Sequence, residues 1–229
     1  VDVTSTLPAG YRELPVVGYH RALPAEGLLA LNPSLVIGSE HLGPPKVLAT
    51  LESAAIPVMQ LPSAETVADL QQNIASIAEA LGGAAKAESS LTALEQQKTL
   101  LEASPLSNER IAFVLAVEPG KMRIAGNDTS GDAFIRLLGA ENIADFDAYR
   151  TLSAEAILEL SPTVILVAGH EGATPERLLE LNTIVRHGQA AKSGRILPVD
   201  AANLVAGLSP NAVADAVTLA QAIASKPGN

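Results

Sequence analysis

Blocks of helical and strand-like hydrophobic spacing alternate along the chain. Over Leu23–Ile37, leucines at helical spacing predict a short amphipathic helix, which Pro33 ends, and the apolar run that follows predicts a buried strand. The same order recurs over Leu152–Leu166, where Pro162 ends the helix. This alternation predicts an α/β fold with mainly parallel sheets.

The same periodicities predict the other elements. Strands are expected at Ile56–Gln60, Arg110–Ala116, Met122–Ala125 and Arg195–Val199. Helices are expected at Pro45–Ala54, Val67–Leu81, Thr129–Leu138, Pro175–Glu180 and Ala212–Ser225. Residues 84–103 lack Gly and Pro and are rich in Ala, Leu, Glu, Gln and Lys, which predicts one long helix.

Two of these segments form an internal repeat. Leu23–Ile37 and Leu152–Leu166 align without a gap at an offset of 129 residues, with six of fifteen positions identical. The match extends outward at the same offset, pairing Arg21 with Arg150, His41 with His170 and Gly43 with Gly172. A match that spans a helix, a proline, a strand and a His-x-Gly sequence favours two related lobes.

The repeat predicts the domain organisation. We expect an N-terminal lobe at residues 1–83, a connecting helix at 84–104 and a C-terminal lobe at 105–229, with a ligand cleft between two Rossmann-like lobes. Far fewer residues precede the first copy of the repeat than the second. The first lobe is therefore expected to lack an opening strand and helix.

Composition narrows the classes of function. The formal net charge of -10 argues against nucleic acid and against an anionic membrane surface as partners. The absence of Cys excludes thiolate metal sites and Cys nucleophiles. No apolar run is long enough to insert into a membrane, and no signal peptide is visible. The protein is thus expected to be either cytoplasmic or a processed, mature chain.

Ligands of α/β sheets bind at the carboxyl ends of the strands. His41 follows the predicted strand Leu35–Gly38, and His170 follows Val164–Val167, so both are expected at that edge. Residues 126–132, GNDTSGD, follow a strand and open a helix, so we expect their backbone N–H groups at the same edge.

Catalytic motifs are incomplete. Asp132 stands where a P-loop needs Lys, and Thr174 stands where the HExxH zinc motif needs its second His. No spacing joins Ser, His and Asp into a triad. These gaps argue against an enzyme and favour a binding protein.

The stretch GYxRxLxAEGLLxLxPxLVI, at Gly18–Ile37, resembles the periplasmic heme-binding proteins of bacterial ABC-type heme importers. These belong to the class III substrate-binding proteins, with relatives that bind siderophores and cobalamin. The segments IPVMQLP, AGNDTSGDAFIRLLGAENIA and LSAEAILELSP extend the resemblance over nearly the whole chain. It implies two lobes joined by one long helix, ferric heme as the transported ligand, and a periplasmic location after removal of a signal peptide. It also implies an ABC permease dimer as partner; we expect a monomer that binds no nucleic acid and does not enter the membrane.

The resemblance implies roles for individual residues. Tyr19 matches the tyrosine that ligates ferric heme iron, and Arg21 matches the arginine that hydrogen-bonds the tyrosine oxygen. The chemistry is consistent, because a free Tyr has a pKa of about 10 and both iron and a guanidinium stabilise its anion. Candidate heme contacts are His170, His41, Tyr149, Asn127 and Thr129. Among these, His170 is the candidate ligand for a second heme, as some relatives hold two.

Glu26 and Glu155 occupy identical positions of the repeat, in the first turns of matching helices. A carboxylate there favours the helix dipole whether or not anything binds. The resemblance implies that each glutamate also meets arginines of the permease.

Other interpretations stay open. The same scaffold could carry a siderophore or a corrinoid, although neither offers an open iron position to a tyrosine. A manganese or zinc carrier would need clustered His and carboxylates, which the scattered histidines do not provide. His20 is expected at the surface, because alternation directs it away from Tyr19, and His187 is expected in a solvated loop.

Overall fold

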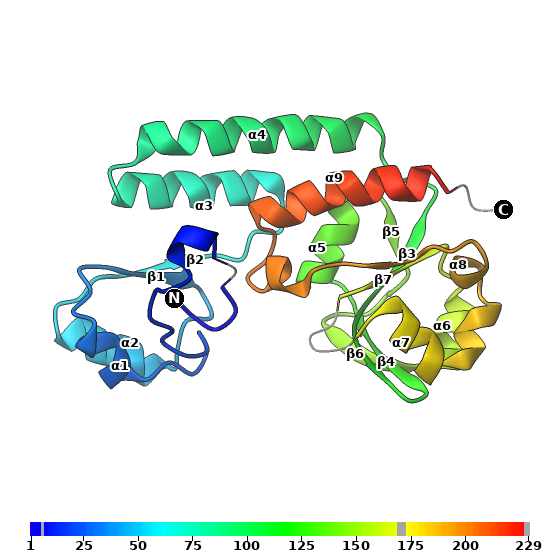
Figure 1. The fold of residues 1–229 in the computed structure, drawn as a ribbon, viewed down its shortest axis with the longest axis horizontal. Helices are drawn as coiled ribbons and strands as arrows, with labels where there is room; N and C mark the ends of the chain where they lie inside the picture. The colour runs from blue at the N-terminus through cyan, green and yellow to red at the C-terminus, as the bar shows by residue number, and fades with distance from the viewer. Residues whose placement is uncertain (6, 169–172, 227–229) are drawn as a thin grey trace. The chain divides into compact units, whose positions relative to one another are not determined.

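The computed structural model describes residues 1–5, 7–168 and 173–226. The chain divides into two compact units, Val1–Ser63 and Ala64–Asn229. Figure 1 shows the elements of both units along the chain.

The first unit contains one short parallel sheet. Its elements are η1 (Ala9–Tyr11), α1 (Ala25–Ala30), β1 (Val36–Ser39), α2 (Pro45–Ser53) and β2 (Val58–Leu61). β1 and β2 pair in parallel, with Val36 opposite Val58. The core of this unit is aliphatic because aromatic residues are scarce in the chain; its buried members are Leu23, Leu28, Leu42, Val47 and Leu51.

The second unit begins with two helices that lie side by side, α3 (Val67–Ala80) and α4 (Ala84–Ala103) (Figure 1). Gly82 has a φ of +64°, a conformation that favours glycine, and lets the chain reverse between them. The predicted long helix is confirmed with the same bounds. Leu94 and Leu101 of α4 are buried in the core of this unit. The bounds of the lobes and the connecting role of α4 stay predictions.

A six-stranded sheet forms the centre of the second unit, in the order β6-β4-β3-β7-β8, with β5 also paired to β3. Its strands are β3 (Arg110–Glu118), β4 (Lys121–Ala125), β5 (Glu141–Asn142), β6 (Tyr149–Ser153), β7 (Val164–Val167) and β8 (Ile196–Pro198). β3, β5, β7 and β8 pair in parallel, whereas β4 is antiparallel to both β3 and β6. The predicted α/β fold with mainly parallel sheets is confirmed.

Successive side chains of a strand point to opposite faces, and the central strands follow this rule without a polar interruption. In β3, Ile111 and Phe113 belong to one core, and Ala112 and Val114 belong to the other. Helices α5 (Ser130–Leu137) and α9 (Pro210–Ala224) supply residues to the first core. Helices α6 (Ala154–Leu160), α7 (Pro175–Leu181) and α8 (Gln189–Lys192) supply residues to the second. Burial on both faces explains the continuous apolar runs of the sequence.

The internal repeat is visible in local geometry. α1 with β1 and α6 with β7 are equivalent helix–strand units. Asn32 and Ser161, at the same offset of 129 residues, both adopt left-handed backbone angles, with φ of 45° and 50°. Each stands directly before a proline, which cannot continue a helix. Both copies therefore end their helix and enter their strand in the same way.

The β3–β4 hairpin and β6 add to the predicted sheet. Residues 122–125 form a strand that runs antiparallel to β3 and returns to the level of the carboxyl end of β7, since Ile124 and Val167 both lie opposite Val114. The segment 126–132 that follows β4 therefore starts near this edge. β6, at Tyr149–Ser153, was not predicted, because an edge strand that is mostly half-buried or exposed has no hydrophobic alternation to reveal it. Among the described helices, none combines the length and the apolar character that a membrane span requires.

Candidate functional site

Tyr19 lies in a turn that the backbone holds from two sides. The carbonyl of Tyr19 accepts a hydrogen bond from the N–H of Ala22 at 2.8 Å, which closes the turn. On one side, the N–H of Val3 donates to the carbonyl of Gly18 at 3.0 Å. On the other, the N–H of Gly43 donates to the carbonyl of His20 at 2.9 Å. The loop is thus fixed before any ligand arrives.

Gly18 is required directly before Tyr19. Its φ is +104°, a conformation that side chains bearing a Cβ rarely adopt. Any other residue at this position would be strained. The sequence pattern Gly18-Tyr19 is therefore explained by the backbone path that presents the tyrosine.

The side chains of Tyr19 and Arg21 are accessible. Tyr19 is 44% exposed. Arg21 is also exposed. Neither the phenol hydroxyl nor the guanidinium makes a hydrogen bond to a described residue, and the two groups do not bond to each other. The predicted Arg21–Tyr19 hydrogen bond stays a prediction for the ligand-bound protein.

The prediction that His20 lies at the surface is wrong. His20 is only 8% exposed, and its Nδ1 lies 2.9 Å from the Oδ2 of Asp2. Alternation holds for an extended strand, whereas residues 19–22 form a turn, so it could not give the direction of this side chain. The ring of His20 instead packs against that of Tyr19, with centroids 4.5 Å apart.

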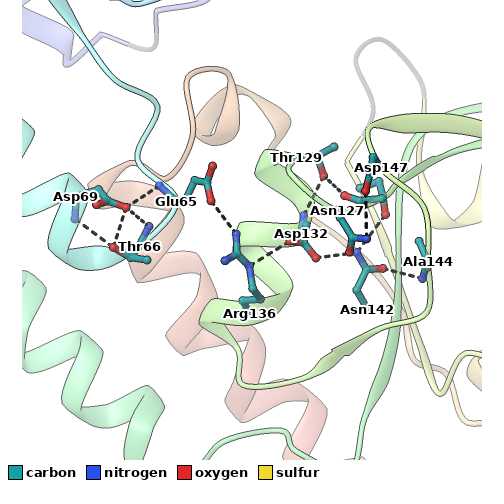
Figure 2. A network of polar contacts seen from close by, with 12 residues as sticks. Glu65, Thr66, Asp69, Asn127, Thr129, Asp132, Arg136, Asn142, Ala144 and Asp147 are labelled. Atoms are coloured by element: carbon teal, nitrogen blue, oxygen red, sulfur yellow. Dashed lines mark hydrogen bonds and ion pairs between the residues drawn. The ribbon is translucent and has the colours of Figure 1, made fainter.

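The segment 126–132 of the second unit is held by its own polar network, which Figure 2 shows. The hydroxyl of Thr129 donates to the carbonyl of Gly126 at 2.7 Å and accepts from the N–H of Asp132 at 3.1 Å. Thr129 is therefore the N-cap of α5, and its side chain is buried. The amide of Asn127 lies 3.5 Å from the Oδ1 of Asp147, at the limit of a hydrogen bond. Contact of Asn127 and Thr129 with heme stays a prediction.

Asp132 joins this segment to its surroundings. Its carboxylate accepts from the Nδ2 of Asn142 at 3.0 Å and pairs with the guanidinium of Arg136 at 3.1 Å. Arg136 in turn contacts Glu65 at 3.1 Å, just before the capping box of α3 (Figure 2). The residue that breaks the P-loop pattern thus has a structural role in anchoring the start of α5.

A small cavity of about 150 Å³ opens beside the start of α5. Its lining residues are Phe113, Leu115, Ser130, Tyr149, Ala201, Leu204 and Val205. Leu115 lies on β3 beyond the level of β7, and Ala201 follows β8, so the cavity is at the carboxyl edge of the parallel strands. The hydroxyls of Tyr149 and Ser130 lie 3.2 Å apart, and Arg123 stands 5.8 Å from the centre of the Tyr149 ring. The cavity at this edge therefore has mostly apolar walls and two hydroxyl groups, those of Tyr149 and Ser130.

The family model for periplasmic binding proteins matches residues 1–202. The chain belongs to the periplasmic binding protein family. This family of binding proteins agrees with the two-lobed α/β fold that the repeat predicts.

Solved structures similar to this periplasmic binding protein include two heme-binding proteins. The periplasmic heme-binding protein HutB of Vibrio cholerae is 32% identical, with a TM-score of 0.86, over 96% of this chain and 88% of that chain. A periplasmic heme-binding protein from Pseudomonas aeruginosa is also 32% identical, with a TM-score of 0.84, over 100% of this chain and 85% of that chain.

A vitamin B12-binding protein of Vibrio parahaemolyticus is 24% identical over 74% of this chain. The chain spans less than two thirds of the length of the curated relatives it matches, at 62% and 66%.

The remaining predicted site residues of this periplasmic binding protein lie in different settings. His41 is exposed and follows β1, at the carboxyl edge of the first unit as predicted. His170 lies outside the described residues. Glu26 and Glu155 are both exposed in the first turns of α1 and α6. The described residues contain no group of three or more His, Cys, Asp or Glu that could hold a metal ion.

Sequence reasoning missed three residues of interest in this periplasmic binding protein. Asp2 was missed because it is 18 residues from its partner His20 and belongs to no motif. Ser130 and Leu204 both line the cavity. Ser130 lies in the segment 126–132 that is predicted at the carboxyl edge, but no pattern distinguishes its hydroxyl from the other polar groups there. Leu204 belongs to no motif.

Proposed function

We propose that this protein binds ferric heme in the periplasm through a Tyr19 axial ligand and delivers it to an inner-membrane ABC importer. The observation that carries the proposal is the Tyr19 loop. An exposed phenol lies on a turn held by backbone hydrogen bonds, two residues from an exposed guanidinium. Neither group makes a hydrogen bond to a described residue. The identity of 32% to heme-binding relatives supports the same ligand.

The chemistry of the two side chains suits ferric heme. Ferric iron is a hard cation that favours an anionic oxygen donor, and tyrosine is an established heme ligand. The phenolate is scarce at neutral pH because the pKa of a free Tyr is about 10. Iron and the Arg21 guanidinium, which stays charged, both favour the anion. Tyr19 is thus expected to ligate iron as the phenolate, with Arg21 donating to its oxygen.

A corrinoid is the second candidate, because vitamin B12-binding proteins are among the relatives. A corrinoid offers no open iron position to a phenolate. It would leave the exposed Tyr19 and Arg21 without a specific role. The Tyr19 loop therefore favours heme over the corrinoid.

The two candidates are separated by titrating the purified protein with hemin and, independently, with cyanocobalamin. We expect saturable binding of hemin with a charge-transfer band typical of ferric tyrosinate, and no saturable binding of cyanocobalamin. The measurement is the absorption spectrum, with calorimetry for the corrinoid. Saturable cyanocobalamin binding without a tyrosinate band would replace the heme proposal by the corrinoid one.

Delivery is proposed to depend on Glu26 and Glu155. The two carboxylates occupy equivalent positions of the repeat and are both exposed. One exposed carboxylate in each copy of the repeat suits a dimeric permease that presents one cationic site per subunit. Replacing either glutamate with Ala is expected to slow transport by about tenfold, and replacing both by more. Uptake of heme into vesicles that carry the importer measures this effect.

The control for docking is Glu159→Ala, since Glu159 is exposed on the same helix as Glu155 but is not part of the repeat match. Heme affinity should be unchanged in all of these variants. Equal transport by Glu26→Ala, Glu155→Ala and Glu159→Ala would show that the first-turn glutamates serve only the helix dipole.

A further inference from the structure

The buried imidazole of His20 makes a direct contact with the proposed iron ligand. The centroids of the His20 and Tyr19 rings are 4.5 Å apart, with an angle of 59° between the ring planes. Tilted arrangements at this separation are favourable for aromatic pairs. Because His20 is 8% exposed while Tyr19 is 44% exposed, the imidazole forms the inner support of an outward-facing phenol.

His20 is itself held by Asp2. The Nδ1 of His20 lies 2.9 Å from the Oδ2 of Asp2, which also accepts from the hydroxyl of Thr4 at 2.7 Å. The hydroxyl of Ser5 donates to the other carboxylate oxygen at 2.7 Å. Partial burial opposes ionisation of this carboxyl, but the hydrogen bonds from Ser5, Thr4 and His20 outweigh it and lower the pKa of Asp2. A charged Asp2 fixes Nδ1 of His20 as a donor.

The other nitrogen of the ring argues against a purely space-filling role. The Nε2 of His20 is buried and has no hydrogen-bond partner among the described residues. A buried polar atom without a partner costs free energy, so an apolar ring would fill the same space more favourably. The backbone bond from Val3 to Gly18 already joins the two segments. The bond between Asp2 and His20 is therefore not needed to attach the N-terminal segment to the Tyr19 loop. Its effect is to orient the imidazole of His20.

We propose that Asp2 and His20 are positioning residues for Tyr19. The carboxylate fixes the imidazole, and the imidazole holds the phenol ring in the orientation that meets iron. This inference rests on the proposed function, because it assigns the pair a role in presenting the iron ligand. A ligand whose rotamer is fixed before binding loses less conformational freedom when heme arrives, which lowers the cost of binding.

The test compares His20→Ala, His20→Phe and Asp2→Ala with the unmodified protein, each loaded with hemin. His20→Ala and Asp2→Ala are expected to release heme about three- to tenfold faster and to broaden or shift the tyrosinate charge-transfer band, as expected for the loss of one ring contact. His20→Phe retains a ring against Tyr19 but cannot bond Asp2, so it should restore only part of the slow release. His187→Ala, which removes an exposed histidine, is the matched control.

Heme release is measured by transfer to an excess of a heme-capturing apoprotein, and the band by absorption and resonance Raman spectra. Thermal unfolding is recorded for every variant. Lower thermal stability with an unchanged band and release rate would show a structural role and overturn the inference. If His20→Ala failed to fold, faster heme release by Asp2→Ala than by His20→Phe would still support the inference, and equal release by Asp2→Ala and the unmodified protein would overturn it. If the unmodified protein showed no tyrosinate band, the proposed function would fail first, and the inference with it.

Discussion

Replacing Tyr19 with Phe is expected to remove the ferric tyrosinate band and to lower the affinity for ferric heme by more than about a hundredfold. Even residues that only support a metal ligand change metal affinity by about 10- to 100-fold, so loss of the ligand itself should have a larger effect. The substitution removes only the hydroxyl, which makes no hydrogen bond to a described residue. The ring contact with His20 is retained. The fold should therefore be unaffected, and the loss can be assigned to the iron–oxygen bond.

The chain offers a matched control in Tyr11. This tyrosine lies in η1 of the same unit and is 60% exposed, so it is at least as accessible to hemin as Tyr19. Tyr11→Phe should bind hemin as the unmodified protein does. Titrations followed between the ultraviolet and the near infrared measure both variants. Retention of the band in Tyr19→Phe would assign the ligand to another group and would contradict the proposed function.

The helix–strand order of the chain could be predicted because burial on both faces leaves a strong pattern. The apolar run of β7 reflects burial on both faces of the sheet. The run of α4 avoids Gly and Pro, which destabilise the interior of a helix. Both elements could therefore be located from the sequence. The repeat could be predicted for the same reason. Leu28 and Ile157 are both buried at equivalent positions, so both copies preserve the same apolar positions.

The direction of β4 follows from the length of its connection to β3, whereas the direction of a side chain in a turn follows from no local pattern. β4 pairs antiparallel to β3 because only two residues, Pro119 and Gly120, connect them, and a parallel crossover needs about a dozen. Gly120 has a φ of +71°, as a tight hairpin favours. The burial of His20 depends on Asp2, a contact between distant residues that no local pattern records. The motif thus indicated Tyr19 as a candidate ligand, and the contacts that hold its ring are visible only in three dimensions.

The second large effect concerns the amino edge of the central sheet, away from the proposed binding edge. Arg195 and Glu109 form a two-bond ion pair, at 2.8 and 2.7 Å, and the Arg195 side chain is only 3% exposed. Thr163 donates to the same carboxylate at 2.6 Å, and Arg195 also donates to the carbonyl of Ile223 in α9. Glu109, Thr163 and Arg195 are the residues directly before β3, β7 and β8, respectively. The ion pair and its hydrogen bonds therefore join three neighbouring strands to α9.

Arg195→Met is expected to lower the free energy of unfolding of the second unit by about 3 kcal/mol, because it leaves a partly buried carboxylate unpaired. The double variant Glu109→Leu with Arg195→Met should recover most of this loss, since removing both charges removes the unpaired group. Arg177→Met is the matched control. Its ion pair with Glu180 is exposed, at 50% and 67% of the side chains, and should change stability by no more than about 1 kcal/mol. Chemical denaturation measures all three.

The pH dependence of stability gives an independent check on the same pair. Burial opposes ionisation of Glu109, but the hydrogen bonds from Arg195 and Thr163 outweigh it and lower the pKa of this carboxyl below its ordinary value of 4.5. A lowered pKa in the folded state contributes stability that is present above pH 4.5 and is lost as the pH falls through the folded value. The unmodified protein should therefore lose this contribution below about pH 4.5, and the double variant should not. Equal acid sensitivity of the two proteins would show that other carboxylates dominate. Heme affinity at neutral pH should be the same in both, because the pair stabilises the edge of the sheet opposite to the one at which the ligand is proposed to bind.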